Sequence, residues 1–265
     1  MNAPGSDVSH RRGYLAPSTQ AVARAMSDAA MRAGPVVAES VTAEVGRLGR
    51  LTGDLEVFAA AAPRADGLDV VTELAMRELE RGRWMKGAGL EVTATDASGA
   101  DATATGKLNP GERSALVRVP LAAGSRGPWK VRVRVTGDGI PAEDRIDVAE
   151  PAGSFVGAPI AFRGAATARQ APQPVAQFLF RRGERLRVEW PIVKAAETRT
   201  ARVLDRRGQP IGAAMPVIER TGNGGQSWLL LDLPLALAEG DYVIELTTSS
   251  GADSDIKLLA FRIGR

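Results

Sequence analysis

The sequence predicts a mainly β protein with two tandem immunoglobulin-like β-sandwich domains, preceded by a short α-helical segment. The main observation is a repeated pattern: a strand ending in Pro-Leu, a small-residue loop with glycine, an aromatic residue and an alternating strand. It occurs at residues 116–135 and again at 230–246. Short strands separated by turn signals at regular spacing support this class, because sandwiches are built from such strands. Coincidental similarity of two amphipathic hairpins is the alternative at this stage.

Alternation within the two repeated stretches predicts which side chains are buried. Successive side chains of a strand point to opposite faces of a sheet, so one face of each strand should line a core. The expected inward residues are Val131, Val133 and Val135 in the first copy and Tyr242, Ile244 and Leu246 in the second; Lys130, Arg132 and Arg134 face outward. We interpret these cations as the polar face of an edge or half-exposed strand, where they discourage aggregation.

Prolines and aromatic residues mark the ends of the repeated strands. Pro120 and Pro234 lack the amide proton that a central ladder needs, so each is expected at a strand end or edge. Trp129 and Tyr242 stand where the next strand begins. Sandwich domains often carry an aromatic residue at such a corner, where it packs on the core or ties down a loop.

Residues 1–50 are expected to form an N-terminal tail and helical linker. Residues 1–13 are polar and are expected to be poorly ordered, and an alanine- and methionine-rich helix is predicted at 19–33. A second helix is predicted at 36–48, since valines and a leucine recur there at helical spacing. Its apolar stripe should brace the first sandwich; binding of a partner protein is the alternative.

The first β domain is expected at residues 51–150 and the second at 151–265, with a boundary at 150–154. Strands of the first are predicted at 55–58, 68–74, 90–95, 102–108, 114–121, 129–135 and 146–148, with a short helix at 75–81. Aspartate favours turn starts and glycine tolerates positive φ, so 96–99 is predicted to be a turn, as is 109–111.

The second domain is expected to begin with an irregular, proline-containing segment that extends to Pro174. Its strands are predicted at 178–180, 186–190, 201–204, 217–218, 228–233, 242–247 and 256–263. The first two should form a hairpin around Arg182-Gly183. The turn at 205–208 repeats the Asp-to-Gly pattern of 96–99, and 249–255 is predicted to be a polar turn.

Composition excludes several classes of function. The chain has 265 residues, enough for two domains, and a net charge of +3 from 34 basic and 31 acidic residues, too small to imply nucleic acid. Cysteine is absent, which excludes disulfides, thiol catalysis and thiolate metal sites. The single histidine, His10, cannot supply a multi-histidine metal site, and a Ser-His-Asp triad is not expected from this chain alone. No cofactor is therefore expected.

Hydropathy predicts neither a membrane span nor an export signal in the chain as given. No apolar run approaches the roughly 18–20 residues of a membrane-spanning helix. The first seven residues, Met-Asn-Ala-Pro-Gly-Ser-Asp, contain no apolar signal core.

Several motifs resemble parts of a known bacterial family. Arg11-Arg-Gly-Tyr-Leu-Ala-Pro17 resembles the end of the von Willebrand factor A-related domain of many acidobacterial proteins, where such a strand end leads into an alanine- and proline-rich helical linker. Further stretches resemble the tails of those proteins: Gly82-Arg-Trp84, Lys86-Gly-Ala88, 95–99, Pro128-Trp129, 181–190, 203–206 and 240–242.

The resemblance implies that the chain is the C-terminal part of a longer, exported adhesion-type protein, or a truncated relative of such proteins. An extracytoplasmic location and association with an upstream A domain would follow. The family's metal site, an Asp-x-Ser-x-Ser loop, lies in the A domain, which would precede residue 11. Asp96-Ala-Ser-Gly-Ala100 lacks the second serine, so no metal-site residue is carried over.

A cluster of arginines is the main candidate for a binding site. It comprises Arg181, Arg182, Arg185 and Arg187 around one predicted turn and Arg206 and Arg207 in another. Such a cluster would suit an anionic glycan, a phosphate or an acidic protein partner. The alternative is a solvated face on which these arginines pair with Glu184, Glu189 or Asp205.

Other candidates have weaker support. Acidic pairs occur at Glu78/Glu80, Glu143/Asp144 and Asp253/Asp255, but a glycosidase needs two acids across one cleft. Asp253-Ser-Asp255 also has hard oxygen ligands of the kind that calcium prefers. The glycine-rich stretch 222–225 is expected to be a hairpin tip rather than a phosphate cradle. The four tryptophans, Trp84, Trp129, Trp190 and Trp228, are expected as core anchors, with a sugar site as the alternative.

These observations favour a non-catalytic pair of β-sandwich modules that serves as a scaffold or a protein-interaction arm. A carbohydrate- or envelope-polymer-binding module is the first alternative, and it would use the arginine cluster or an exposed tryptophan. A hydrolase with a carboxylate site is the second. The geometry of the tryptophans and of the acids should discriminate between them.

Overall fold

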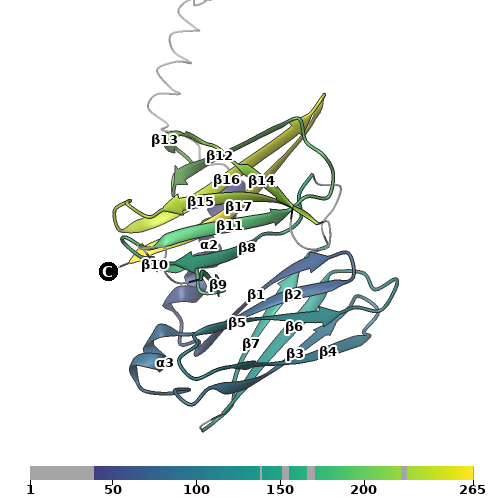
Figure 1. The fold of residues 1–265 in the computed structure, drawn as a ribbon, viewed down its shortest axis with the longest axis vertical. Helices are drawn as coiled ribbons and strands as arrows, with labels where there is room; N and C mark the ends of the chain where they lie inside the picture. The colour runs from purple at the N-terminus through teal and green to yellow at the C-terminus, as the bar shows by residue number, and fades with distance from the viewer. Residues whose placement is uncertain (1–38, 138, 151–154, 166–170, 222–225, 265) are drawn as a thin grey trace, which may run out of the picture. The chain divides into compact units, whose positions relative to one another are not determined.

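The computed structural model describes residues 39–137, 139–150, 155–165, 171–221 and 226–264. The predicted helix at 19–33, most of the predicted boundary at 150–154 and the glycine-rich stretch 222–225 lie outside these residues. Within them the chain is a pair of β-sandwiches, as the sequence predicts (Figure 1).

The first sandwich packs a three-stranded sheet on a four-stranded one. The first sheet has the order β1-β2-β5 and the second β4-β3-β6-β7, all antiparallel. Their bounds are β1 Val57–Arg64, β2 Gly67–Leu74, β3 Ala88–Thr95, β4 Asp101–Leu108, β5 Ser114–Pro120, β6 Trp129–Thr136 and β7 Ala142–Val148, with helix α3 at Met76–Glu80. Pairing of the first, second and fifth strands opposite the others is an immunoglobulin-like order.

The second sandwich packs two five-stranded sheets. Their orders are β14-β15-β11-β8-β9 and β10-β17-β16-β12-β13, and only β10 with β17 is a parallel pair among the described strands. The bounds are β8 Ile160–Gly164, β9 Gln173–Val175, β10 Leu179–Arg181, β11 Arg185–Pro191, β12 Thr198–Asp205, β13 Pro210–Met215, β14 Ile218–Thr221, β15 Ser227–Pro234, β16 Gly240–Ser250 and β17 Asp253–Gly264.

Each sandwich has its own apolar core, and the predicted inward faces are confirmed. The three valines of β6 are buried in the first core, and the cations that alternate with them point outward. Tyr242, Ile244 and Leu246 of β16 are buried in the second. Pro120 and Pro234 end β5 and β15. β6 lies between β3 and β7, so its cations belong to a half-exposed strand and not to an edge.

Both predicted corners are tied back to a residue four positions earlier, and the two predicted turns share one pattern of hydrogen bonds. Tyr242 donates its hydroxyl proton to the carbonyl oxygen of Ala238 at 2.9 Å, and Trp129 Nε1 donates to Ser125 Oγ at 3.2 Å. Asp96 Oδ1 accepts from the amides two and four residues later, at 2.9 and 3.0 Å. Asp205 Oδ1 does so at 2.8 and 2.9 Å. In both copies of the repeat, the corner joins two strands that lie in opposite sheets: β5 and β6 in the first sandwich, β15 and β16 in the second.

Four predictions about strands and turns were wrong, either in the kind of element or in its bounds. The segment expected to be irregular before Pro174 contains β8 and the start of β9. The expected hairpin around Arg182-Gly183 is a corner, since β10 and β11 belong to different sheets. The expected strand at 55–58 is β1 at Val57–Arg64, whose four alanines give a weak strand signal. The turn expected at 249–255 is only Gly251-Ala252, because β16 and β17 pair to Ser250 and Asp253.

The predicted helix at 36–48 forms helix α2 (Glu39–Gly46) and a 3-10 helix, η1 (Arg47–Thr52). α2 lies on β16 and β17 with Val41 buried, and Leu48 of η1 is buried as well. The prediction that it braces the first sandwich is wrong for α2, which covers the second. η1 reaches the first sandwich as well, because Arg50 pairs with Asp144 of β7.

Glu44 of α2 makes the stability of the folded protein depend on pH. Burial raises the pKa of its carboxyl group, while Arg47 and a hydrogen bond from the Ala260 amide act in the opposite direction. A carboxyl whose pKa rises on folding contributes stability at low pH, and that contribution is lost as the pH rises through the folded-state pKa.

Glu44→Gln should therefore raise Tm at pH 7 by about 1–3 °C. The gain should vanish near pH 4, where the glutamate is largely protonated in the folded protein. Thermal unfolding at both pH values measures this, with the exposed Glu39→Gln on the same helix as control. A lower Tm of Glu44→Gln at pH 7 would contradict the assignment.

Candidate functional site at the junction of the two sandwiches

Strand β2 is buried on both of its faces. Leu68, Val70 and Leu74 line the core of the first sandwich. The opposite face carries Asp69, Val71 and Glu73, which are also buried. An outer sheet face with acidic residues normally meets water, so its burial means that another part of the protein covers it.

Glu73 is the centre of this second face. Its side chain is 0% exposed, and its carboxylate accepts charge-assisted bonds from both sandwiches. Arg163 Nη1 of β8 lies 2.5 Å from Oε1, and Arg113 Nη2 lies 3.0 Å from it. The amides of Ala176 and Gln177 donate to Oε2 at 2.7 and 2.6 Å. Both oxygens are therefore satisfied without water.

The two arginines extend this network, which we call the Glu73 clamp: Glu73, Arg113, Arg163, Ala176 and Gln177. Arg113 Nε donates to the carbonyl oxygen of Leu74 at 3.2 Å, and Nη2 donates to Gln177 Oε1 at 2.6 Å. Arg163 Nη2 donates to the carbonyl oxygens of Gln177 and Leu179 at 3.1 and 2.7 Å. Burial lowers the pKa of Arg113, and the charge of Glu73 opposes this shift.

A second charged contact lies farther along the same face. Arg64 Nε donates to Asp69 Oδ2 at 2.7 Å, and Nη1 reaches the carbonyl oxygen of Ala158 at 3.3 Å. The guanidinium carbon lies 4.9 Å from the centre of the Trp228 ring, in cation–π geometry. Burial lowers the pKa of Arg64, whereas the charge and hydrogen bond of Asp69 raise it.

Apolar side chains complete the junction. A buried cluster joins residues of β1 and β2 to residues of β8 and the segment after β9: Phe58, Ala62, Val71, Ala75, Ile160 and Ala176. Two hollows of about 560 and 690 Å³ flank the junction. The smaller is lined by η1, β1 and β7, and the larger by the 121–126 loop and residues 191–193.

The predicted arginine cluster occupies one end of the second sandwich. The strand register shows this through three neighbouring pairs: Arg181 and Gly264, Ile263 and Gly240, and Tyr242 and Asp205. The turn at 181–185 and the turn at 205–208 therefore lie at the same end of the sandwich. Arg206 and Arg207 line a shallow hollow of about 530 Å³ there. Arg187 lies inside β11, away from the turn.

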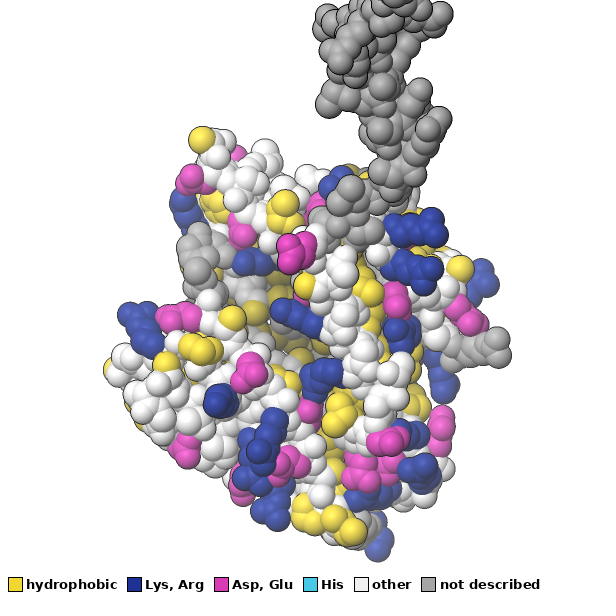
Figure 2. All heavy atoms as spheres, turned by 180° about the vertical axis from the view of Figure 1, so that it is seen from behind, with side chains coloured by type: hydrophobic (Ala, Val, Ile, Leu, Met, Phe, Trp, Pro, Cys, Tyr) yellow, Lys and Arg dark blue, Asp and Glu magenta, His cyan; other side chains and the backbone are white. Residues whose placement is uncertain are grey.

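Acidic side chains accompany these arginines. Arg185 forms a two-pronged pair with Asp232 at 2.9 and 3.2 Å, and Arg187 pairs with Glu189 at 2.5 Å. Arg181 lies 3.7 Å from Glu80 of the first sandwich. Figure 2 shows basic and acidic side chains interspersed over one face of the molecule. The anion-binding role of the cluster stays a prediction.

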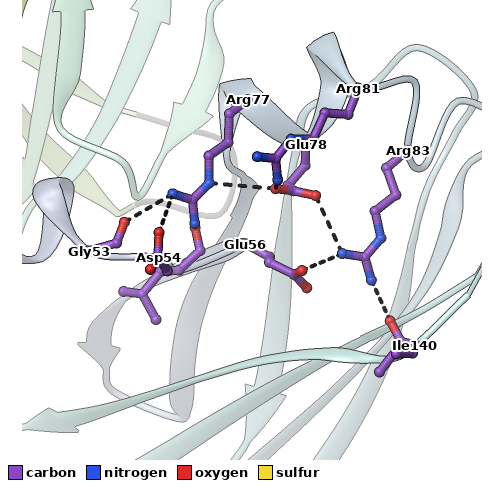
Figure 3. Close-up of polar contacts among 9 residues, drawn as sticks. Gly53, Asp54, Glu56, Arg77, Glu78, Arg81, Arg83 and Ile140 are labelled. Atoms are coloured by element: carbon purple, nitrogen blue, oxygen red, sulfur yellow. Dashed lines mark hydrogen bonds and ion pairs between the residues drawn. The ribbon is translucent and has the colours of Figure 1, made fainter.

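The acidic pairs do not converge. Glu78 of α3 is buried among Arg77, Arg81 and Arg83, at 3.5, 2.9 and 3.4 Å (Figure 3). Glu80 points elsewhere, toward Arg181.

The remaining acids have partners of their own. Glu143 pairs with Arg132 and Arg145, and Asp144 pairs with Arg50 and accepts the Ala59 amide proton. Asp253 and Asp255 pair with Lys194 and Lys257. In the part of the chain that the structure describes, no group of three or more acids or histidines is placed to hold a metal ion.

Three of the four tryptophans are core residues, as predicted. Trp84, Trp129 and Trp190 are buried, and Trp228 is half-buried beneath Arg64 at the junction. The sugar-site alternative gains no support from these positions. Among the described residues, no helix has the length and apolarity needed to cross a membrane.

A scan against protein-family models finds no match, and a search of curated proteins finds none. Among solved structures, a tandem pair of titin immunoglobulin domains matches with a TM-score of 0.23 and 9% identity, over 78% of this chain and 98% of that chain. A second titin fragment matches with a TM-score of 0.22 and 12% identity, over 78% and 100%. A three-immunoglobulin titin fragment matches with a TM-score of 0.20 and 11% identity, over 80% and 66%.

The class of the protein follows from its own geometry. The strand orders of both sandwiches and the tyrosine corner at Tyr242 define a tandem immunoglobulin-like β-sandwich protein. The Glu73 clamp distinguishes it from a pair of sandwiches joined only by a linker.

Proposed function

We propose that this chain is a non-catalytic scaffold whose two sandwiches act as one rigid arm for protein partners. The Glu73 clamp is the observation that carries the proposal. Domains of one chain move relative to each other unless their interface is large and apolar. Here the interface combines an apolar cluster with a fully buried carboxylate that bonds to both sandwiches.

Rigidity is the useful property of such an arm. Separating the sandwiches would break the Arg163–Glu73 pair and would remove two backbone amides from the Glu73 carboxylate, which is costly unless water replaces every bond. The Arg113–Glu73 pair lies within the first sandwich and would remain. Helix α2 and η1 add a third connection, since they contact the second sandwich through Ala260 and the first through Asp144. Surfaces on the two sandwiches are therefore held at a fixed spacing.

We also propose that the arm is the C-terminal part of an exported adhesion-type protein that associates with an upstream A domain. The resemblance of residues 11–17 to the end of a von Willebrand factor A-related domain supports this. The coding sequence upstream tests it: an A domain with an Asp-x-Ser-x-Ser loop is expected there, and an unrelated region would remove the support.

Spin-label distances test the rigid arm. The chain has no cysteine, so Glu91→Cys in the first sandwich and Arg220→Cys in the second give two unique labelling sites. Double electron–electron resonance on protein diluted with unlabelled chain should give one narrow distance distribution. Glu73→Ala should broaden it, whereas Glu80→Ala at the exposed Arg181 pair should not. A broad distribution with Glu73 intact would overturn the proposal.

A further inference from the structure

Strand β4 is a long edge strand of the four-stranded sheet. It pairs with β3 over all eight residues in unbroken register, and no described strand pairs with its other side (Figure 1). It contains no proline and no bulge. Gly106 lets β4 lie close to β5, since a Cβ there would be 2.7 Å from Val117 Cγ2. The strand is therefore firmly held, while its outer backbone groups remain open for pairing.

The other edge strands among the described residues carry protective features. β1 contains Pro63 and β5 ends at Pro120. β7 has the inward-pointing Asp144, which binds the Ala59 amide of β1. β9 and β10 have three residues each, β14 has four, and β13 starts at Pro210 opposite a register shift in β12. Short length, proline, inward charge and bulges are devices that prevent edge pairing, and β4 has none of these four. Its one exposed lysine, Lys107, protects the edge only where no acidic residue lies opposite it.

The sequence of β4 is complementary to itself when it is read backwards. An antiparallel copy centred on Ala104 places Asp101 opposite Lys107 and Thr103 opposite Thr105. Opposite charges and threonine pairs across antiparallel strands are favourable. Both charges and both threonines are exposed, and they lie on one face because they are two residues apart.

We propose that two copies of this chain associate through β4, in antiparallel register about a two-fold axis at Ala104. The two four-stranded sheets then form one continuous sheet across the dimer. The interface is isologous, as closed dimers require, and main-chain hydrogen bonds supply the pairing. Each dimer contains two Asp101–Lys107 pairs, which fix the register.

Charge reversal tests the pairing. Sedimentation velocity over a concentration series should show a monomer–dimer equilibrium for the unaltered chain. Asp101→Lys or Lys107→Asp alone places like charges opposite each other and should weaken dimerisation about tenfold or more. The double variant Asp101→Lys/Lys107→Asp restores opposite charges and should recover most of the affinity. Failure of the double variant to recover it would contradict this register.

Cysteine crosslinking tests the register independently of folding effects. Residues directly opposite each other in antiparallel strands lie within disulfide reach. Mixing Thr103→Cys chains with Thr105→Cys chains under oxidising conditions should give a crosslinked dimer, and neither variant alone should crosslink efficiently. Crosslinking of Thr103→Cys with itself would indicate another register and overturn the proposal. A strictly monomeric chain at high concentration would overturn the proposal as well. The β4 edge would then be available only for pairing with a strand of another protein.

Discussion

Replacing Glu73 with alanine is expected to lower the free energy of unfolding by about 3–5 kcal/mol. The substitution removes the ion-pair partner of the buried Arg113, and it leaves Arg163 with only the longer 3.4 Å contact to Glu184. It also leaves two backbone amides, of Ala176 and Gln177, without their acceptor. A buried charged group that loses its partner lowers the free energy of unfolding by more than the lost contact itself, because water cannot reach the site to replace the partner. Urea unfolding followed by circular dichroism measures the change.

Two variants make this result specific to the clamp. Glu80→Ala removes a carboxylate that pairs with Arg181 at 3.7 Å on the exposed surface, and it should cost less than about 0.5 kcal/mol. Glu73→Gln keeps one acceptor oxygen, so its loss in the free energy of unfolding should lie between those of Glu73→Ala and Glu80→Ala. If Glu73→Ala unfolded at the same urea concentration as Glu80→Ala, the junction would not be held by the clamp.

Trp84→Ala is expected to have an effect of similar size, about 3–5 kcal/mol. The indole is 1% exposed in the first core, and it packs against the Arg83 guanidinium and the backbone at Gly137. The backbone φ of Trp84 is 65°, which L residues rarely adopt. Such a conformation costs on the order of 1–3 kcal/mol, so the buried ring has to compensate for it.

Glycine at this position separates the two effects. Trp84→Gly loses the ring but relaxes the backbone, so it should be no more destabilising than Trp84→Ala, the reverse of the usual order of glycine and alanine. Met85→Ala is the control, since its 56% exposed side chain should contribute less than about 0.5 kcal/mol. A Trp84→Gly variant clearly less stable than Trp84→Ala would show that the positive φ is not strained.

Local patterns in the sequence predict most of the fold. The alternation at Val131–Val133 and at Tyr242–Ile244 predicts the buried faces, because the inward and outward positions of a strand can be identified from that strand's own sequence. Asp96 and Asp205 predict their turns because each carboxylate accepts hydrogen bonds from amides only two and four residues later, so the signal is local. β8 was missed, since its five residues follow a proline-containing stretch and carry no alternation.

The junction was not predicted, and its residues explain why. In the sequence, Asp69 and Glu73 alternate with apolar residues as the solvent-facing side of any half-buried strand would. Their partners lie up to 104 positions away in the chain, and no local pattern encodes such pairing. Arg113 and Arg163 likewise resemble ordinary surface arginines. Only the tertiary arrangement shows that Glu73, Arg113 and Arg163 meet at the junction, while Asp69 pairs with Arg64 farther along the same face.

Differential scanning calorimetry of the unaltered chain tests the central claim most directly. If the clamp and its apolar surroundings make one body of the two sandwiches, a single transition should appear, with equal calorimetric and van't Hoff enthalpies. Two separate transitions, or a van't Hoff enthalpy near half the calorimetric value, would show that the sandwiches unfold independently and would contradict the account.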